Sequence, residues 1–269
     1  MIPVDTAIYR VRRDLTLSIL LKAGLSLTVL GCMLVGNDNL RIVSLMGAGA
    51  LWLWLSLTSA RGSRAAAESP QLIASGEFEA AERNIENTVR TFSLFRTVKL
   101  QSLHHLAILR HAQRRWQESA ALAKALLGQR LGPLQPLSKS TRLLLADSLL
   151  EMNDLRGTYD AIAGLYREPL SLAESLSLMA VQLDYSARIG AWASMMENLM
   201  SKVQLAELLP SGSSARAQGF LALAARRIGR ADVADWLAAR AALLGDIPKL
   251  IAERPMLREL WGTDRQEVP

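Results

Sequence analysis

The chain begins with two long apolar stretches. The first, Leu15–Val35, contains one charged residue, Lys22, and the second, Leu40–Thr58, contains only Arg41 at its start. As helices they would be roughly 31 Å and 28 Å long at ~1.5 Å per residue, and a hydrocarbon core is ~30 Å thick. The turn-forming residues 36–39 separate them. The pattern predicts a transmembrane hairpin in a lipid bilayer, with the long Lys22 side chain reaching the near interface.

After residue 64 the apolar positions recur at helical spacing in shorter stretches. One short pattern recurs five times: a turn residue, then a polar residue, then a bulky apolar residue in four of the five cases. The intervals are 38, 39, 37 and 39 residues, and the turns begin at Gly76, Arg114, Asn153, Gly190 and Gly229. Prolines follow most of the second helices, at Pro133, Pro136, Pro169, Pro210 and Pro248. Because proline ends helices, each unit reads as helix, turn, helix and break. Long alternating β-branched runs are missing, so the pattern predicts an all-α fold.

Around these turns the chain resembles the tetratricopeptide repeat family. The family's leucine and small residue in the first helix are matched by Leu106-Ala107, Leu145-Ala146 and Leu221-Ala222. Its aromatic residue after the turn is matched by Phe78, Trp116 and Trp192, and its small residue in the second helix by Ala81, Ser119, Thr158 and Ala234. The chain departs from the family in a period nearer 38 than 34 residues. It also has Leu155 and Ala231 at aromatic positions and Met195 at a small one.

The resemblance covers roughly residues 65–250 and implies an α-solenoid of about five helix pairs. The expected organisation is a membrane anchor over residues 1–64, a TPR-like repeat domain over 65–254 and a C-terminal tail over 255–269. The residues expected to build the repeat turns are Gly76, Phe78, Trp116, Leu155, Gly190, Trp192 and Gly229.

Basic residues predict the orientation of the hairpin. Of the net charge of +6, residues 1–64 contribute +4 through the bases Arg10, Arg12, Arg13, Lys22, Arg41, Arg61 and Arg64 against three acids. Five of these seven bases flank the two ends of the hairpin near the chain terminus and the repeats, and the turn has only Arg41. The positive-inside rule therefore places both termini and the repeats in the cytoplasm, at an inner membrane. A cleaved signal peptide fits poorly because a second apolar stretch follows at once. The remaining residues are nearly balanced in charge, so no nucleic-acid partner is expected.

The candidate chemistry is sparse. Phosphate-loop, Gly-x-Ser-x-Gly, His-Glu-x-x-His and Cys-x-x-Cys motifs are missing, and Cys32 is the single cysteine, so neither enzyme activity nor a cofactor is expected. The only candidate ligands are His104, His105 and His111 on one predicted helix. His104 and His111 would lie about 10 Å apart, and Ile108 between them cannot bind a metal. We expect these histidines to lie partly exposed on the repeat surface.

Two charged clusters are further candidates for a functional site. Arg110, Arg114 and Arg115 end a predicted helix, where basic residues favour the helix dipole without any ligand. Asp147, Glu151 and Asp154 are expected to form a solvated acidic face.

The favoured function is a membrane-anchored scaffold or assembly factor that binds a partner protein through the solenoid. Two alternatives stay open. One is a structural subunit of a membrane complex that associates through its hairpin, and the other is a haem- or metal-handling protein that uses the three histidines.

Overall fold

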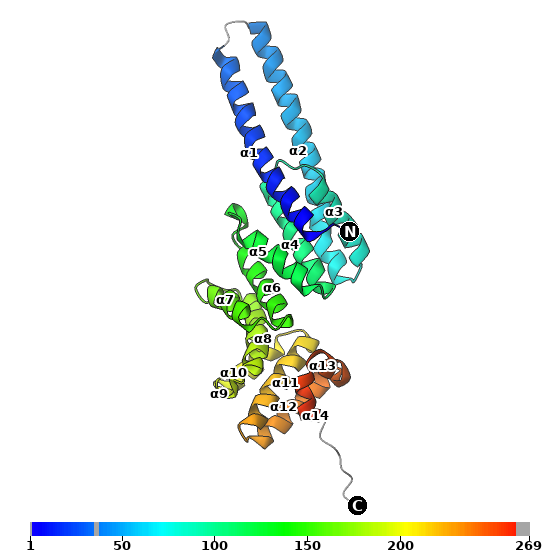
Figure 1. The fold of residues 1–269 in the computed structure, drawn as a ribbon, viewed down its shortest axis with the longest axis vertical. Coiled ribbons are helices and arrows are strands. Elements are labelled where there is room, and N and C mark those ends of the chain that lie inside the picture. Colours follow the sequence, from blue (N-terminus) through cyan, green and yellow to red (C-terminus); the bar gives the residue numbers. More distant parts are fainter. Residues whose placement is uncertain (1, 35–37, 262–269) are drawn as a thin grey trace, which may run out of the picture. The chain divides into compact units, whose positions relative to one another are not determined.

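A computed structural model of the chain describes residues 2–34 and 38–261. Every described element of secondary structure is helical (Figure 1), which confirms the all-α prediction. The centre of the expected turn between the two apolar stretches, Gly36 and Asn37, lies outside the described residues. The chain divides into two compact units, Met1–Met152 and Asn153–Pro269.

Unit 1 contains two long helices followed by shorter ones. The elements are α1 (Val4–Leu34), α2 (Asp38–Ala74), α3 (Phe78–Arg90), α4 (Arg96–Ala112), α5 (Trp116–Leu127), η1 (Gly132–Leu134) and α6 (Leu137–Glu151). Helices α2, α3 and α4 pack against one another, α1 lies on α2 and α4, and α5 contacts both α4 and α6. Buried side chains on α3 fall three or four residues apart, which gives the helix one apolar face towards this core: Ala81, Ile85, Thr88 and Val89.

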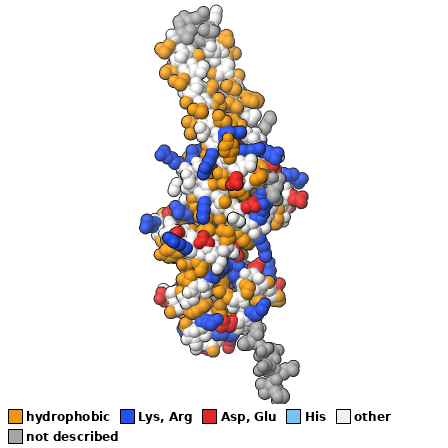
Figure 2. All heavy atoms as spheres, viewed as in Figure 1, with side chains coloured by type: hydrophobic (Ala, Val, Ile, Leu, Met, Phe, Trp, Pro, Cys, Tyr) orange, Lys and Arg blue, Asp and Glu red, His pale blue; other side chains and the backbone are white. Residues whose placement is uncertain are grey.

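The two apolar stretches are helical, and each is long and apolar enough to cross a membrane. The candidate spans are Val4–Cys32 and Ile42–Ala60. Only 17% and 11% of their most apolar windows are buried, whereas a core helix of a soluble protein would be mostly buried. Large apolar side chains on both helices are exposed, including Leu27, Leu34 and Met46. Figure 2 shows these apolar side chains covering the outside of the paired long helices.

Both long helices extend beyond the predicted spans. The first turns of α1 bury Ala7, Val11 and Leu15 in the core of unit 1. Helix α2 continues past Thr58 to Ala74 and includes Pro70. The expected boundary at residue 64 therefore lies inside a continuous helix, whose last part forms an antiparallel pair with α3.

Five turns share one backbone conformation. The residues with positive φ are Gly76 (81°), Arg114 (61°), Asn153 (59°), Gly190 (73°) and Gly229 (82°). In each case a helix begins two residues later, at Phe78, Trp116, Leu155, Trp192 and Ala231. At Gly76 the N–H donates to the Ile73 carbonyl at 3.1 Å, and the N–H of Glu77 donates to that of Leu72 at 2.9 Å. This is the Schellman pattern, which satisfies carbonyls at the end of a helix.

The small positions after the turns lie in the contacts between helices. Ser119 Oγ donates to the Ala107 carbonyl at 2.9 Å and accepts from Ser148 Oγ at 3.1 Å. All three residues are buried, so α4, α5 and α6 approach closely around one hydroxyl pair.

In unit 2 most of the other helices pack around one central helix, α11. Its elements are α7 (Leu155–Leu165), α8 (Leu172–Arg188), α9 (Trp192–Met196), α10 (Leu199–Glu207), α11 (Ser211–Arg227), α12 (Ala231–Leu244), α13 (Ile247–Glu253), η2 (Pro255–Leu257) and α14 (Arg258–Trp261). Helix α11 contacts α8, α9, α10, α12 and α14. Its alanines Ala217, Ala222 and Ala224 are buried beside Phe220 and Leu221, and they allow these helices to approach closely.

Unit 2 departs from the sequence expectation at two places. The second helix of the fourth pair is broken between α9 and α10, where Asn198 adopts a left-handed conformation with φ of 50°. The expected tail starting at residue 255 is also corrected. Residues 255–261 form η2 and α14, and Leu257 and Leu260 are buried in the same core as α11. Residues 262–269 lie outside the described residues.

Gly245 leaves no room for a side chain, because a Cβ there would lie 2.6 Å from Cβ of Ala215. We expect Gly245→Ala to lower the free energy of unfolding by about 1–3 kcal/mol, the usual cost of overpacking. Denaturant unfolding of the full chain in detergent, followed by circular dichroism, measures the change. The matched control is Gly212→Ala in α11, where nothing lies within 4 Å and the loss of glycine in a helix should stabilise slightly. Equal effects of the two substitutions would contradict the packing at Gly245.

Candidate functional site

The three candidate ligand histidines lie on α4, but they do not form a shared surface site. His104 is 5% exposed, and its Nδ1 lies 3.1 Å from Oγ1 of Thr141 on α6. The expectation of an exposed His104 is therefore wrong, because α6 covers this face of α4. Burial lowers the pKa of His104 to about 4. The ring is neutral near neutral pH and already has a partner in the core.

His105 and His111 have their own surroundings. His111 Nε2 lies 3.1 Å from Oδ2 of Asp147, and its ring packs edge-on against Trp116 at a centroid distance of 4.7 Å. His105 is half-buried, with its ring 6.1 Å from that of His104. Among the described residues, no three His, Cys, Asp or Glu side chains converge so as to hold a metal ion. His104 and His111 link α4 to α6 through Thr141 and Asp147, and His111 also packs against Trp116 of α5.

Protonation of His104 should destabilise the chain in acid. Its pKa is about 4 when folded and near 6.5 when exposed, so between these values the unfolded chain binds more protons. Stability is therefore lost as pH falls from about 6.5 to 4, by on the order of 3 kcal/mol for this group. Unfolding of the wild type and His104→Gln across this pH range measures the effect. The variant should show a shallower dependence on pH, and an unchanged slope would contradict the assignment.

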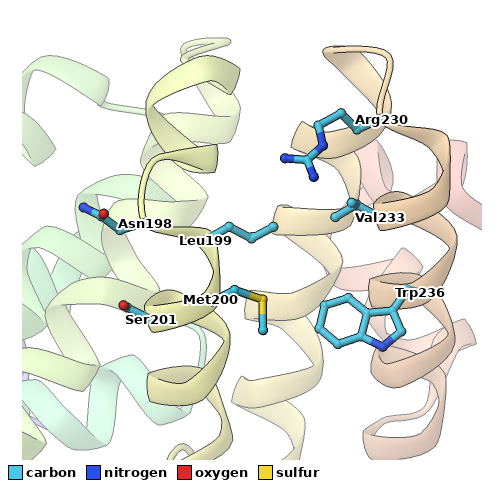
Figure 3. A pocket seen from close by; sticks show the side chains of 7 residues that line it. All are labelled: Asn198, Leu199, Met200, Ser201, Arg230, Val233 and Trp236. Atoms are coloured by element: carbon cyan, nitrogen blue, oxygen red, sulfur yellow. The ribbon is translucent and has the colours of Figure 1, made fainter.

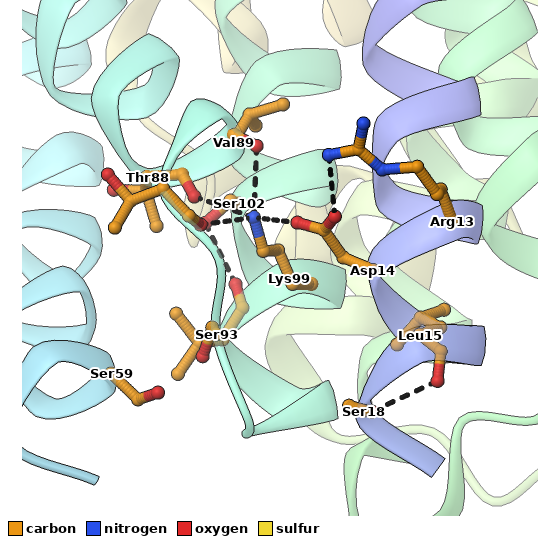
Figure 4. Close-up of polar contacts among 12 residues, drawn as sticks. Arg13, Asp14, Leu15, Ser18, Ser59, Thr88, Val89, Ser93, Lys99 and Ser102 are labelled. Carbon is orange, nitrogen blue, oxygen red and sulfur yellow. Dashed lines mark hydrogen bonds and ion pairs between the residues drawn. The ribbon is translucent and has the colours of Figure 1, made fainter. Parts of the chain in front are cut away.

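A buried ion pair joins the first long helix to α4 (Figure 4). Lys99 Nζ lies 2.7 Å from Oδ2 of Asp14, and the two side chains are 0% and 1% exposed. Lys99 Nζ also donates to the carbonyls of Thr88 at 3.1 Å, Val89 at 2.9 Å and Thr91 at 2.6 Å. Burial lowers the pKa of Lys99, and the hydrogen bond and charge of Asp14 oppose that shift. The ammonium of Lys99 thus caps the C-terminal end of α3 and holds α1 beside that end through Asp14.

Arg110 forms a second buried charged group in unit 1. Its side chain is 0% exposed, with NH2 2.9 Å from Oε1 of Glu82 and Nε 3.2 Å from Oε2 of Glu118. The expected interaction with the helix dipole does not account for the burial of Arg110, because α3 and α5 supply two carboxylates for it. Lys99 and Arg110 line up at helical spacing with the buried Leu103 and Leu106, and this signal could have identified them as buried charges.

Unit 2 carries an open, mainly apolar groove between α10 and α12, which we call the α10–α12 groove (Figure 3). Its volume is about 590 Å³, and its lining residues are Asn198, Leu199, Met200, Ser201, Arg230, Val233 and Trp236. Leu199 and Met200 point across the groove towards Val233 and Trp236. Met200 is 60% exposed and Trp236 41% exposed, although both side chains are large and apolar. No sequence feature indicated this groove, because it depends on the break before α10.

A smaller pocket of about 290 Å³ lies between α7, α8, α9 and α10. Tyr159 and Tyr185 line it with ring centroids 6.4 Å apart, and Gln182 bonds Tyr166 at its edge. Lys202 on its wall donates to the carbonyl of Ser194, within α9, at 2.8 Å, and burial lowers the pKa of Lys202. Since its main polar groups already bond to the protein, this pocket is a weaker binding candidate than the α10–α12 groove.

The hairpin carries a third hollow, of about 670 Å³, between α1 and α2. Lys22, Leu25 and Val29 line one side, and Gly49 and Trp52 line the other. A hollow with small residues on an exposed apolar helix allows another helix to approach closely within a membrane.

Comparison with protein-family models, curated proteins and solved structures gives no significant match. The description of the site therefore depends on the geometry of this chain. That geometry includes an open apolar groove in unit 2, and the buried charged side chains Asp14, Lys99 and Arg110 are engaged in structural pairs.

Proposed function

We propose that the protein is a membrane-anchored interaction scaffold or assembly factor. In this proposal α1 and α2 cross an inner membrane as a hairpin, with both termini in the cytoplasm. The helix pairs that follow form a TPR-like solenoid, and the α10–α12 groove binds a segment of a partner protein. The regular helix–turn–helix spacing of about 38 residues supports the repeat reading.

The anchor is supported by the uncovered apolar faces of the long helices. Protein buries little of these faces, and contiguous exposed apolar surface of this extent requires lipid or a partner. Arginines at the termini of the hairpin, Arg12, Arg13 and Arg64 among them, are exposed and support the cytoplasmic orientation.

The observation that carries the binding proposal is the exposure of Met200 and Trp236 on facing walls of one groove. Tryptophan anchors interfaces strongly, and methionine adapts its shape to different partners. Arg230 projects into the groove at one end (Figure 3), and a carboxylate would satisfy it. An amphipathic segment with an apolar face and an acidic residue at one end fits this lining.

Site-specific crosslinking tests the proposal. A photo-crosslinking residue at Ser201 in the full chain should capture a discrete membrane-associated partner. Met200→Glu and Trp236→Ala should reduce that product about tenfold or more, as expected for residues that anchor an interface. Leu243→Glu is the matched control, because Leu243 is 85% exposed on α12 and does not line the groove. A product unaffected by either groove substitution would refute binding in this groove.

The hollow between α1 and α2 favours a second candidate function, a structural subunit that associates through its hairpin. Replacing residues 15–58 with an unrelated two-span hairpin distinguishes the two functions. Loss of association with the groove intact would support the subunit function, and retained association would support the scaffold. The described surroundings of His104, His105 and His111 give no support to a haem- or metal-handling function.

A further inference from the structure

We propose that the loop between α3 and α4, residues 91–95, is a third contact of unit 1 with the bilayer. In this proposal Phe92 and Phe95 enter the interfacial layer, and arginines around the loop contact anionic lipid headgroups. The inference rests on the proposed insertion of the hairpin, and it adds a lipid-binding surface to the domain that follows.

The loop is fixed at the level where the apolar hairpin ends. The Leu94 N–H donates to Oγ of Ser59 at 2.9 Å, and Ser59 lies at the end of the candidate span Ile42–Ala60. Leu94 itself is buried. The loop therefore sits beside the final turn of the second span, where hydrocarbon would give way to headgroups.

Phe92 lies against the other long helix at the same end. It lines a groove of about 570 Å³ with residues of α1, including Leu17, Leu20 and Leu21, which begin the predicted first span. These leucines would face lipid, so the groove is continuous with the surface that the hairpin offers to the bilayer. This continuity makes lipid the expected occupant of the groove. Phe95 follows in the same loop and is 38% exposed.

The buried ion pair holds this loop in place (Figure 4). Lys99 bonds the carbonyls of Val89 and Thr91 where the loop begins, and it pairs with Asp14 directly before Leu15. The Phe95 N–H donates to Oγ of Ser93 at 3.2 Å within the loop. The phenylalanines are therefore presented by a defined backbone at a fixed height on α1.

The charge around the loop matches an anionic membrane surface. Figure 2 shows Lys and Arg side chains gathered where the apolar column of the hairpin ends. Arg90 and Arg96 flank the loop, and Arg13 and Arg90 have side chains 53% and 58% exposed. Arg13 pairs with Asp14 and Arg90 with Glu86, yet both keep surface open to a phosphate. Each basic residue near such a surface contributes about 1 kcal/mol to binding, and apolar side chains such as Phe insert at the boundary between headgroups and acyl chains.

Nitroxide labelling of the full chain in vesicles tests the inference. In a Cys32→Ser background, a label at Thr91→Cys reports on the loop while keeping both phenylalanines. Leu27→Cys reports on the hairpin, and Glu77→Cys reports on the exposed turn at the opposite end of α3. The vesicles contain phosphatidylcholine with a minority of phosphatidylglycerol. Collision rates with oxygen and with a water-soluble nickel chelate give the depth of each label.

We expect Thr91→Cys to show an oxygen-to-nickel ratio between those of Leu27→Cys and Glu77→Cys. Adding Phe92→Ser and Phe95→Ser should lower this ratio towards that of Glu77→Cys, whereas Tyr159→Ser, an exposed aromatic in unit 2, should leave it unchanged. A ratio at residue 91 equal to that at Glu77, with Leu27 in lipid, would overturn the loop contact alone. A water-accessible Leu27 would overturn both this inference and the membrane anchor.

Discussion

Replacing Asp14 with asparagine should lower the free energy of unfolding by about 3–5 kcal/mol, because it leaves the Lys99 ammonium buried without its counter-charge. Lys99 is 0% exposed, and its three carbonyl acceptors lack the full charge needed to replace a carboxylate. Since Asp14 lies on α1 and Lys99 on α4, the loss should loosen the attachment of the first long helix to the helix pairs.

A double-mutant cycle on the full chain in detergent measures the interaction free energy between Asp14 and Lys99 apart from their other contacts. Lys99→Met should also destabilise, and Asp14→Asn combined with Lys99→Met should cost clearly less than the sum of the two. Arg83→Met is the matched control, because Arg83 is exposed on α3 and should change stability by under about 0.5 kcal/mol. Additive effects of the two core substitutions would show that the two charges do not interact.

Asp184→Asn should have an effect of similar size in unit 2. Oδ2 of Asp184 lies 2.6 Å from Nε of Arg254, and Oδ1 lies 2.8 Å from Nε of Arg188. Asp184 is 3% exposed and Arg254 6% exposed, so one carboxylate serves two cations in a site with little water. Its neutralisation should cost about 3–5 kcal/mol and release the segment from α13 to α14, which Arg254 ties to α8.

Limited trypsin digestion detects that release directly. Cleavage after Lys249 or Arg258 should become faster in Asp184→Asn by about tenfold or more, since opening of this segment would need less free energy. Asp160→Asn is the control, because Asp160 is exposed on α7. Unchanged cleavage within residues 249–258 would show that packing of Leu257 and Leu260 alone holds the segment.

Local sequence signals were sufficient to predict the positions of the five turns. Gly76, Gly190 and Gly229 supply the positive φ at no steric cost, and Asn153 is the side chain that tolerates it best. Arg114 adopts the same conformation without that advantage, and its position could be inferred only from the spacing of the other turns. Asn198 has the same residue preference as Asn153, but it lies outside the repeat spacing and inside a stretch that is helical by composition, so the break was not predicted.

The partners of the buried charges show what the sequence could not predict. Lys99 and Arg110 resemble surface residues in composition, and their partners lie far along the chain, at Asp14, Glu82 and Glu118. His104 likewise is a core residue because α6 covers it, and its own helix does not show this. Pairing over such separations depends on which helix faces meet, and the period of a single helix carries no information about its neighbour.

The sequence by itself determined the helical class, the two apolar helices and the turn positions, because hydrophobic period, length and backbone preference act over a few residues. The tertiary structure decided which buried charges pair, that residues 255–261 pack into a core, and that Met200 and Trp236 face one another across a groove. It also brought the loop of residues 91–95 beside Ser59, at the end of the candidate span in α2. These features arise only when separate helices pack, since burial and proximity are properties of the assembled chain.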